Sequence, residues 1–309
     1  MLRKPPKLNK GDTIGIVGPA SPMMKERLEK GVNYLLQNGF QIKLGESVRK
    51  ECGYLAGKDD ERAADVNDMF SDPDVAAIFC TRGGYGTPRI LDKIDYPQIK
   101  RTPKILVGYS DITALQLAIL KKANVVTFSG PMVAVEMGKG IKPFTETRFW
   151  KLLTDSNEQV KFTGINGNLR CLKKGRAGGR LLGGCLSLIC SLLGTDFLPD
   201  FRNAILFIED VGEEPYKIDR KLTQLKLSGI LHRIGGLVIG RFEDCVPPSD
   251  SPSLTIDEIL HDLTSDLDIP VVMDLPYGHI DIKYTLPVGV QAFLDADQGS
   301  LEILESPVI

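Results

Sequence analysis

Short apolar segments alternate with amphipathic segments over the first half of the chain, and this alternation restricts the possible folds most strongly. The apolar segments span residues 12–17, 40–44, 74–80, 104–108 and 124–129. Residues 58–70, which lie between two of them, are charged on one face and apolar on the other, as a covering helix is. Parallel strands joined by helices give this order. The pattern predicts an α/β fold with a mostly parallel, doubly wound sheet.

The first helix and the end of the third strand carry turn signals. Ser21 and Pro22 have the character of an N-cap and a first-turn proline, and Gly39 is expected to end the helix that they begin. Residues 81–86 form a glycine-rich turn after the third strand. Ligands bind at the carboxyl ends of parallel strands in open α/β sheets, so this turn is a candidate binding element.

The pattern changes after Trp150. Two strand-like runs, residues 160–163 and 168–172, indicate a hairpin or a crossover linker, and residues 178–193 predict a tight turn followed by a buried helix. The last apolar runs, within residues 286–304, resemble closing strands of a more antiparallel module. We expect an N-terminal α/β domain over residues 1–155, a linker over 156–176 and a smaller β-rich domain over 177–309.

Composition excludes several classes of function. The chain has 309 residues, 42% of them hydrophobic, and a formal net charge of -2, which offers no basic surface for nucleic acid. It has no signal-peptide pattern and no apolar run of membrane-spanning length, so we expect a cytoplasmic protein with no membrane partner. Its cysteines form no C-x-x-C pair, and we expect buried reduced thiols, no metal site and no cofactor; they are residues 52, 80, 171, 185, 190 and 245.

Residues 104–119 predict a short strand, a turn that carries Ser110, and an amphipathic helix. A serine on such a turn has its hydroxyl at the edge of the sheet, where the first amides of the helix face a developing anion. Gly108 matches the first glycine of the nucleophile-elbow motif, but the second is absent. Ser110 or Asp111 could instead cap the helix, and both interpretations remain open.

The chain contains three histidines, which limits the candidates for a catalytic base. His232 follows a predicted helix, where it suits a C-terminal cap, and His261 lies on the acidic face of another. His279 differs because it follows a buried strand and Gly278, which lets the backbone turn so that the imidazole can face a cleft.

Glu209 continues the buried strand of residues 204–208, and a carboxylate in that position needs a partner. His279 suits it, although Arg180 or Lys217 could pair with Glu209 instead. With Ser110, these residues form a candidate triad in which Glu209 orients His279 and His279 takes the serine proton.

Several sequence blocks match one known family in order along nearly the whole chain. They cover residues 10–21, 81–86, 108–113, 183–187, 208–216 and 278–279. In these blocks the chain resembles the LD-carboxypeptidases, serine peptidases that trim murein peptides and whose relatives include the microcin C immunity peptidases. The resemblance implies a flavodoxin-like N-terminal domain with the nucleophile Ser110, a β-rich C-terminal domain with Glu209 and His279, and a homodimer whose active sites lie between the domains.

The same resemblance implies the chemistry of the site. The oxyanion hole uses the backbone amide of Asp111 and that of Gly84, and no metal or cofactor takes part. The substrate is a murein tetrapeptide that loses its terminal D-alanine during cell-wall recycling. Arg82 is a candidate for binding the carboxylate of D-alanine, with a plain surface arginine as the equal alternative.

Two other functions compete with this one. An immunity-type peptidase cleaves acyl-aminoacyl nucleotides, and such relatives carry aromatic residues in an added loop, whereas this sequence has a single tryptophan, Trp150. A non-catalytic protein that binds a small ligand would use Ser110 only as a helix cap. The sequence leaves open whether diaminopimelate or lysine precedes the D-alanine.

Overall fold

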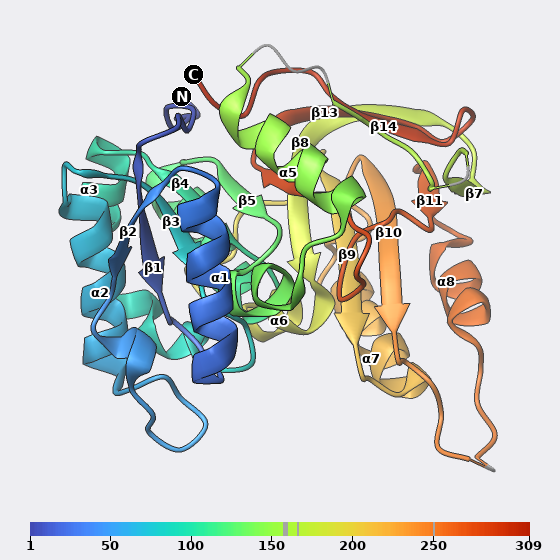
Figure 1. Ribbon diagram of the computed structural model, residues 1–309. Helices are drawn as coiled ribbons and strands as arrows, with labels where there is room; N and C mark the ends of the chain where they lie inside the picture. Colours follow the sequence, from blue (N-terminus) through green and yellow to red (C-terminus); the bar gives the residue numbers. More distant parts are fainter. Residues whose placement is uncertain (157–159, 166, 250) are drawn as a thin grey trace.

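Two β-sheets lie side by side in the computed structural model of the protein, one built mainly from the first half of the chain and one from the second (Figure 1). The structure describes residues 1–156, 160–165, 167–249 and 251–309. Buried apolar side chains from both halves form one continuous hydrophobic cluster, so the sheets share a core.

The first sheet has the strand order β12-β5-β4-β3-β1-β2. Its strands are β1 (Thr13–Val17), β2 (Gln41–Leu44), β3 (Val75–Cys80), β4 (Ile105–Gly108), β5 (Thr127–Ser129) and β12 (Leu286–Val288). Strands β1 to β5 are parallel, which confirms the predicted mostly parallel sheet, and β12 joins antiparallel to β5. The central strands β3 and β4 are buried almost throughout, which explains their continuous apolar runs.

Helices connect the strands of this sheet. They are α1 (Lys25–Gln37), α2 (Asp59–Ser71), α3 (Tyr96–Arg101), α4 (Thr113–Ala123) and α5 (Pro143–Thr154), with short helical turns at Ser47–Arg49, Thr87–Lys93, Ser110–Ile112 and Val133–Met137. The start predicted for α1 is wrong, because Met24 is its N-cap and the Ser21 hydroxyl accepts a hydrogen bond from the amide of Tyr85 instead. Helix α4 is buried on nearly every side, not on one face, because it also contacts the second sheet.

The second sheet has the order β6-β14-β13-β8-β9-β10-β11-β7. Its strands are β6 (Lys161–Phe162), β7 (Arg170–Lys173), β8 (Arg176–Cys185), β9 (Ile205–Val211), β10 (Gly236–Glu243), β11 (Val271–Met273), β13 (Gln291–Asp295) and β14 (Ser300–Ile303). Strands β8 to β11 are parallel at its centre, with antiparallel strands outside them. Three helices accompany it: α6 (Leu186–Ser191), α7 (Pro215–Leu227) and α8 (Ile256–Thr264).

Two sequence predictions for the second half are settled by the structure. The runs 160–163 and 168–172 are the crossover and not the hairpin, because β6 pairs with β14 and β7 with β11 at opposite edges of the sheet. Residues 157–159 and 166 of the expected linker lie outside the described residues. The first half of the run 178–193 belongs to strand β8, not to a turn, and its glycines allow the neighbouring backbones to approach closely; the predicted helix begins only at Leu186.

Strand β12 shows that the C-terminal segment contributes to both sheets (Figure 1). The division into domains at residues 155 and 177 stays a prediction. The cysteines are free, but Cys52 and Cys171 are exposed, so the prediction that all the thiols are buried is wrong for these two. Cys171 is exposed because β7 is an edge strand.

Candidate active site

Ser110 occupies the turn between β4 and α4 with a backbone φ of 64°. This left-handed conformation is costly for a residue with a side chain and is typical of strained turns at functional sites. The side chain is half-buried, and none of the described residues forms a hydrogen bond with its hydroxyl. Ile112 is the N-cap of α4 and no side chain caps the helix, so the capping alternative for Ser110 is wrong.

Asp111 is buried and does not cap α4 either. Its carboxylate accepts a hydrogen bond of 2.7 Å from the amide of Thr87, which lies just after the glycine-rich turn. Burial raises the pKa of Asp111, although the hydrogen bonds from Thr87 oppose the increase. The bond fixes the glycine-rich turn beside the start of α4, so the backbone amide of Asp111 has a defined position.

The glycine-rich turn approaches Ser110 through Gly83. A Cβ atom at position 83 would lie 2.8 Å from the Cβ and 2.9 Å from the Oγ of Ser110, so only glycine fits there. Gly84 lies one residue further, where a Cβ would meet the side chain of Ser21. Sequence analysis singled out Gly84 and missed Gly83, although the paired glycines of the turn were a visible signal.

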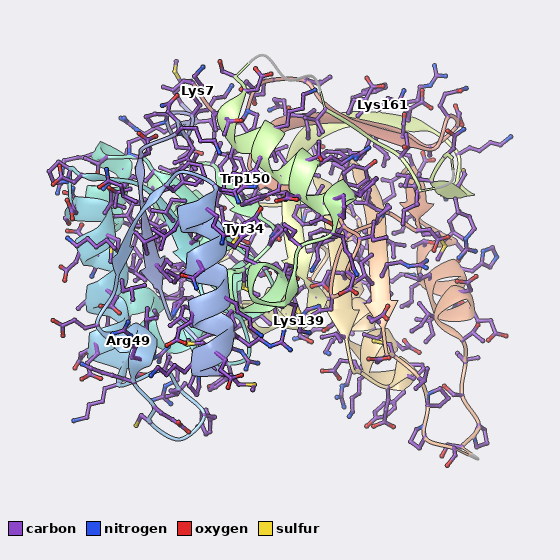
Figure 2. All side chains as sticks on the ribbon, in the orientation of Figure 1. Lys7, Tyr34, Arg49, Lys139, Trp150 and Lys161 are labelled. Carbon is purple, nitrogen blue, oxygen red and sulfur yellow. The ribbon has the colours of Figure 1, made fainter. Side chains whose placement is uncertain are left out.

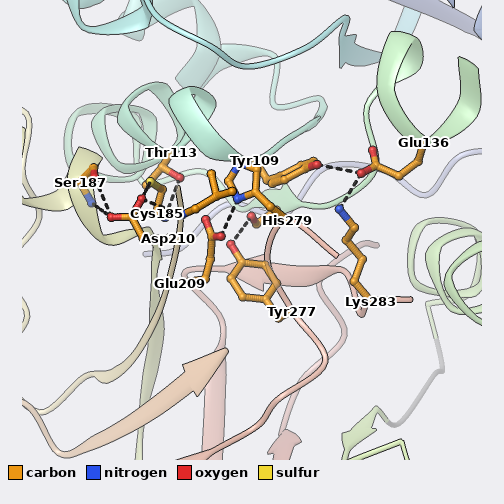
Figure 3. Close-up of polar contacts among 12 residues, drawn as sticks. Tyr109, Thr113, Glu136, Cys185, Ser187, Glu209, Asp210, Tyr277, His279 and Lys283 are labelled. Atoms are coloured by element: carbon orange, nitrogen blue, oxygen red, sulfur yellow. Dashed lines mark hydrogen bonds and ion pairs between the residues drawn. The ribbon is translucent and has the colours of Figure 1, made fainter. Parts of the chain in front are cut away.

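His279 and Glu209 meet in the structure. Nδ1 of His279 lies 2.7 Å from Oε2 of Glu209, which is fully buried, while the His279 side chain is 18% exposed (Figure 3). A Cβ at Gly278 would lie 2.8 Å from the same carboxylate oxygen, and its φ is +118°, so a glycine is required for this approach. The remaining oxygen, Oε1, has no hydrogen-bond partner among the described residues.

The alternative partners of Glu209 are engaged elsewhere. Arg180 donates to the carbonyl of Gly289 and to Asn124, and Lys217 pairs with Glu214 at 2.9 Å. The other two histidines, His232 and His261, are exposed.

A buried cluster of Tyr109, Glu136 and Lys283 links the turn that carries Ser110 to the loop that carries His279 (Figure 3). The ring of Tyr109 meets that of His279 edge-on, with 5.0 Å between centroids. The Tyr109 hydroxyl donates to Oε1 of Glu136 at 2.8 Å, and the Lys283 ammonium lies 2.5 Å from the same oxygen and 3.9 Å from the centre of the Tyr109 ring. Burial raises the pKa of Glu136, but Lys283, with the hydrogen bonds from the Met132 amide and the Tyr109 hydroxyl, outweighs it and holds that pKa below its usual value. Sequence analysis missed this cluster.

A second polar network fixes α4 to the second sheet. The amide of Cys185, at the end of β8, donates to the Thr113 hydroxyl at 3.1 Å. Asp210 accepts from the amide and hydroxyl of Ser187 at 3.0 and 2.6 Å and lies 3.4 Å from the Lys221 ammonium (Figure 3). The turn that carries Ser110 and the strand that carries Glu209 are therefore joined through defined contacts.

Arg82 is exposed, and no hydrogen bond or ion pair joins it to His279 or Glu209 among the described residues. Its guanidinium donates to the carbonyls of Gly83 and Pro22 at 3.2 and 3.3 Å. Across the described ranges, no group of three or more His, Cys, Asp or Glu side chains is arranged to hold a metal ion. The chemistry that this arrangement offers is nucleophilic attack by a serine with a histidine–carboxylate pair nearby.

Comparison with known proteins gives a consistent result. The LD-carboxypeptidase N-terminal domain matches residues 14–130 and the LD-carboxypeptidase C-terminal domain matches residues 178–294. A probable murein peptide carboxypeptidase of Bacillus subtilis is 41% identical over 301 residues, which cover 97% of this chain and 94% of the relative. The microcin C7 self-immunity protein MccF of Escherichia coli is 31% identical and covers 96% of this chain and 94% of its own length.

A solved structure agrees with these relatives. The muramoyltetrapeptide carboxypeptidase from Oxalobacter formigenes superposes with a TM-score of 0.86 at 32% identity, covering 96% of this chain and all of that chain (100%). Both domain matches and all three relatives point to one family. The chain therefore belongs to the LD-carboxypeptidase family and is a serine-type peptidase.

Proposed function

We propose that this protein hydrolyses the bond to the terminal D-alanine of a murein tetrapeptide. The names of the Bacillus subtilis and Oxalobacter formigenes relatives support a murein peptide as substrate. The observation that carries the proposal is the 2.7 Å contact between His279 and the buried Glu209, in a chain whose Ser110 has the strained turn of a nucleophile.

In this proposal each residue of the triad has one role. Ser110 attacks the peptide carbonyl as His279 takes its proton, and Glu209 orients the imidazole through Nδ1, which leaves Nε2 as the base. His279 then gives the proton to the leaving amine of D-alanine, and water hydrolyses the acyl-enzyme. In the absence of substrate the serine and histidine of such sites are often farther apart than a hydrogen bond.

The oxyanion of the tetrahedral intermediate needs two donors. The backbone amide of Asp111 is one, and the amide of Gly84 in the glycine-rich turn is the other. The close approach of Gly83 to Ser110 supports a donor from this turn. Loss of one such donor costs about 3 to 4 kcal/mol in the transition state.

Trp150 favours a murein peptide over a nucleotide-containing substrate. The centroid of its ring lies 5.0 Å from that of Phe40 and 4.8 Å from that of Phe149. Its indole N–H donates to the Tyr34 hydroxyl at 2.7 Å (Figure 2). The single tryptophan of the chain is thus engaged in packing on α5. The immunity-type activity of the MccF relative remains the second candidate.

Release of free D-alanine from a murein tetrapeptide tests the proposal. Wild type, a Ser110→Ala variant and wild type with a chelator are compared side by side. We expect release that requires Ser110 and is unaffected by the chelator. No release by wild type overturns the proposed substrate, and release by Ser110→Ala overturns the triad.

We also propose that the protein acts as a homodimer in the cytoplasm, on wall fragments that are recycled. Within the part of the chain that the structure describes, no helix combines the length and apolar character needed to cross a membrane. Light scattering after size-exclusion chromatography tests the dimer, which predicts twice the chain mass of 33.9 kDa.

A further inference from the structure

A pocket of about 240 Å³ opens beside His279, between the buried cluster and the start of α5. The polar and charged side chains in its lining are Tyr109, Glu136, Lys139, Lys142, His279 and Asp281. The pocket therefore contains the candidate base of the reaction together with several charges. None of these charges has a role in the triad.

The charges in this pocket are unbalanced. Lys139 and Lys142 are exposed, and neither forms an ion pair with any residue in the described ranges (Figure 2 labels Lys139). Glu136 is already neutralised by Lys283. Asp281 is then the one lining carboxylate without an ion-pair partner among the described residues, whereas the lining has two such ammonium groups. The pocket has an excess of positive charge and favours an anion.

In the proposed reaction the leaving group lies beside His279, which also lines the pocket. In the proposed function, which this inference deepens, His279 gives a proton to the departing amine, so that amine lies against the imidazole. In an amino acid one carbon separates the amine from the carboxylate. A D-alanine that departs past His279 therefore brings its carboxylate to the pocket that His279 lines.

We propose that Lys139 and Lys142 bind the free terminal carboxylate of the substrate and so restrict cleavage to the last residue of a peptide. An amide or a longer chain at this position would leave the two ammonium groups without their anion. Arg82, the earlier candidate for this role, is absent from the pocket lining and donates to backbone carbonyls of the glycine-rich turn.

Two peptides and two double variants test the proposal. The peptides are a murein tetrapeptide that ends in D-alanine and the same peptide ending in D-alaninamide. The test variant is Lys139→Met/Lys142→Met. The control is Lys30→Met/Lys121→Met, which removes the same charge from exposed positions on α1 and α4 outside the pocket. Arg82→Met is measured in parallel.

We expect the test variant to lose roughly tenfold in kcat/KM for the carboxylate peptide, mainly through KM, and to leave the amide peptide unchanged. The preference of wild type for the carboxylate thus disappears in the test variant and persists in the control. The kcat/KM of wild type also falls more steeply with added salt than that of the test variant, because the lysine contacts are screened.

Four results contradict the proposal in different ways. Equal preference in the test variant and in wild type overturns the lysine site, and loss of preference in Arg82→Met alone assigns the carboxylate to Arg82. Equal losses for both peptides in the test variant show a general effect on the fold or on the site. Wild type that cleaves neither peptide overturns the proposed function as well, so the two failures are distinguishable.

Discussion

Single residues at the candidate site adopt conformations that restrict what can replace them. Ser110 has a positive φ, and Gly278 lies so close to Glu209 that a methyl group at its position would meet the carboxylate. Glu209 in turn has one oxygen on His279 and one without a partner among the described residues. A buried carboxylate in this situation is better explained by orientation of the imidazole than by stability, because its second oxygen gains nothing from folding.

The Glu209→Gln variant tests the orienting role. The amide has the size of the carboxylate but cannot hold the imidazole in the same tautomer, so we expect kcat to fall roughly 10⁴-fold with little change in KM. Steady-state kinetics with a murein tetrapeptide measure this. Asp210→Asn is the matched control, because Asp210 is the adjacent buried carboxylate but contacts Ser187 and Lys221 instead of His279. Equal losses in kcat for the two variants contradict the orienting role.

Among single residues, the sequence predicted those roles for which the chain offers few candidates. Only three histidines had to be considered, and one of them followed a strand and a glycine. Lys283 and Glu136 could not be found in this way, because they are separated by 147 residues and lysines and glutamates are common in this chain. Their pairing depends on tertiary packing, which leaves no local pattern.

Among the elements, the Val133–Met137 turn and the loop after β11 are held together by the ion pair of Glu136 with Lys283. Both side chains are almost fully buried, at 9% and 2% exposure. Removing one partner of such a pair leaves an uncompensated charge, whereas replacing both partners by neutral groups is often tolerated. The pair thus fixes the loop that carries His279, although burying the two charges removes them from water, which is unfavourable.

We expect Lys283→Met to lower the free energy of unfolding by about 3 to 5 kcal/mol at pH 7, and Glu136→Gln/Lys283→Met to recover most of this loss. In wild type, Lys283 holds the pKa of Glu136 below its usual value. This stabilisation is fully present at pH values above the pKa that Glu136 has in the unfolded chain. It is lost as the pH falls through the lower pKa that Glu136 has in the folded protein. In Lys283→Met only the hydrogen bonds from the Met132 amide and the Tyr109 hydroxyl still oppose burial, so we expect the pKa of Glu136 to rise and the sign to reverse.

Urea unfolding at pH 5 and pH 7 measures the reversal. Acidification from pH 7 to pH 5 is expected to stabilise Lys283→Met relative to wild type, and to leave the double variant without this relative gain. A Lys283→Met variant that follows the pH dependence of wild type would show that Glu136 reaches water or finds another partner.

Helices and strands were predicted well where the sequence has a clear pattern of apolar and polar side chains. The strands β1 to β5 are apolar runs bounded by turn residues, and all of them were found. Strand β8 was mistaken for a turn and a helix because its glycines have no side chains to display an alternation. The partners of β6 and β7 were missed because pairing across a sheet depends on topology rather than on local sequence.

At the scale of the whole molecule, the two halves are interlocked. Strand β12, from the C-terminal segment, is the edge strand of the first sheet, and the Cys185 amide at the end of β8 donates to Thr113 on α4. The hydroxyls of Tyr277 and Ser129 lie 2.7 Å apart, which adds a third contact between the halves. Neither half has a complete set of partners without the other.

We therefore expect the chain to unfold in one cooperative transition, and a fragment of residues 1–155 to have no cooperative transition of its own. The fragment lacks β12 and the surface that covers α4, so it exposes apolar residues that the full chain buries. Calorimetry on the full chain and thermal circular dichroism on the fragment measure this. Two resolved transitions, or a fragment that melts cooperatively, contradict the prediction.

The position of β12 also has a consequence for synthesis on the ribosome. Ser110 leaves the ribosome long before His279, and β12, which holds the loop of His279 next to β5, follows later still. At about 5–20 residues per second, translation from the serine to this strand takes roughly 10 to 35 s. If the proposed triad acts, we expect a nascent chain to be without hydrolytic activity until it is almost finished, and a product that terminates before β12 to carry all three triad residues but to be inert.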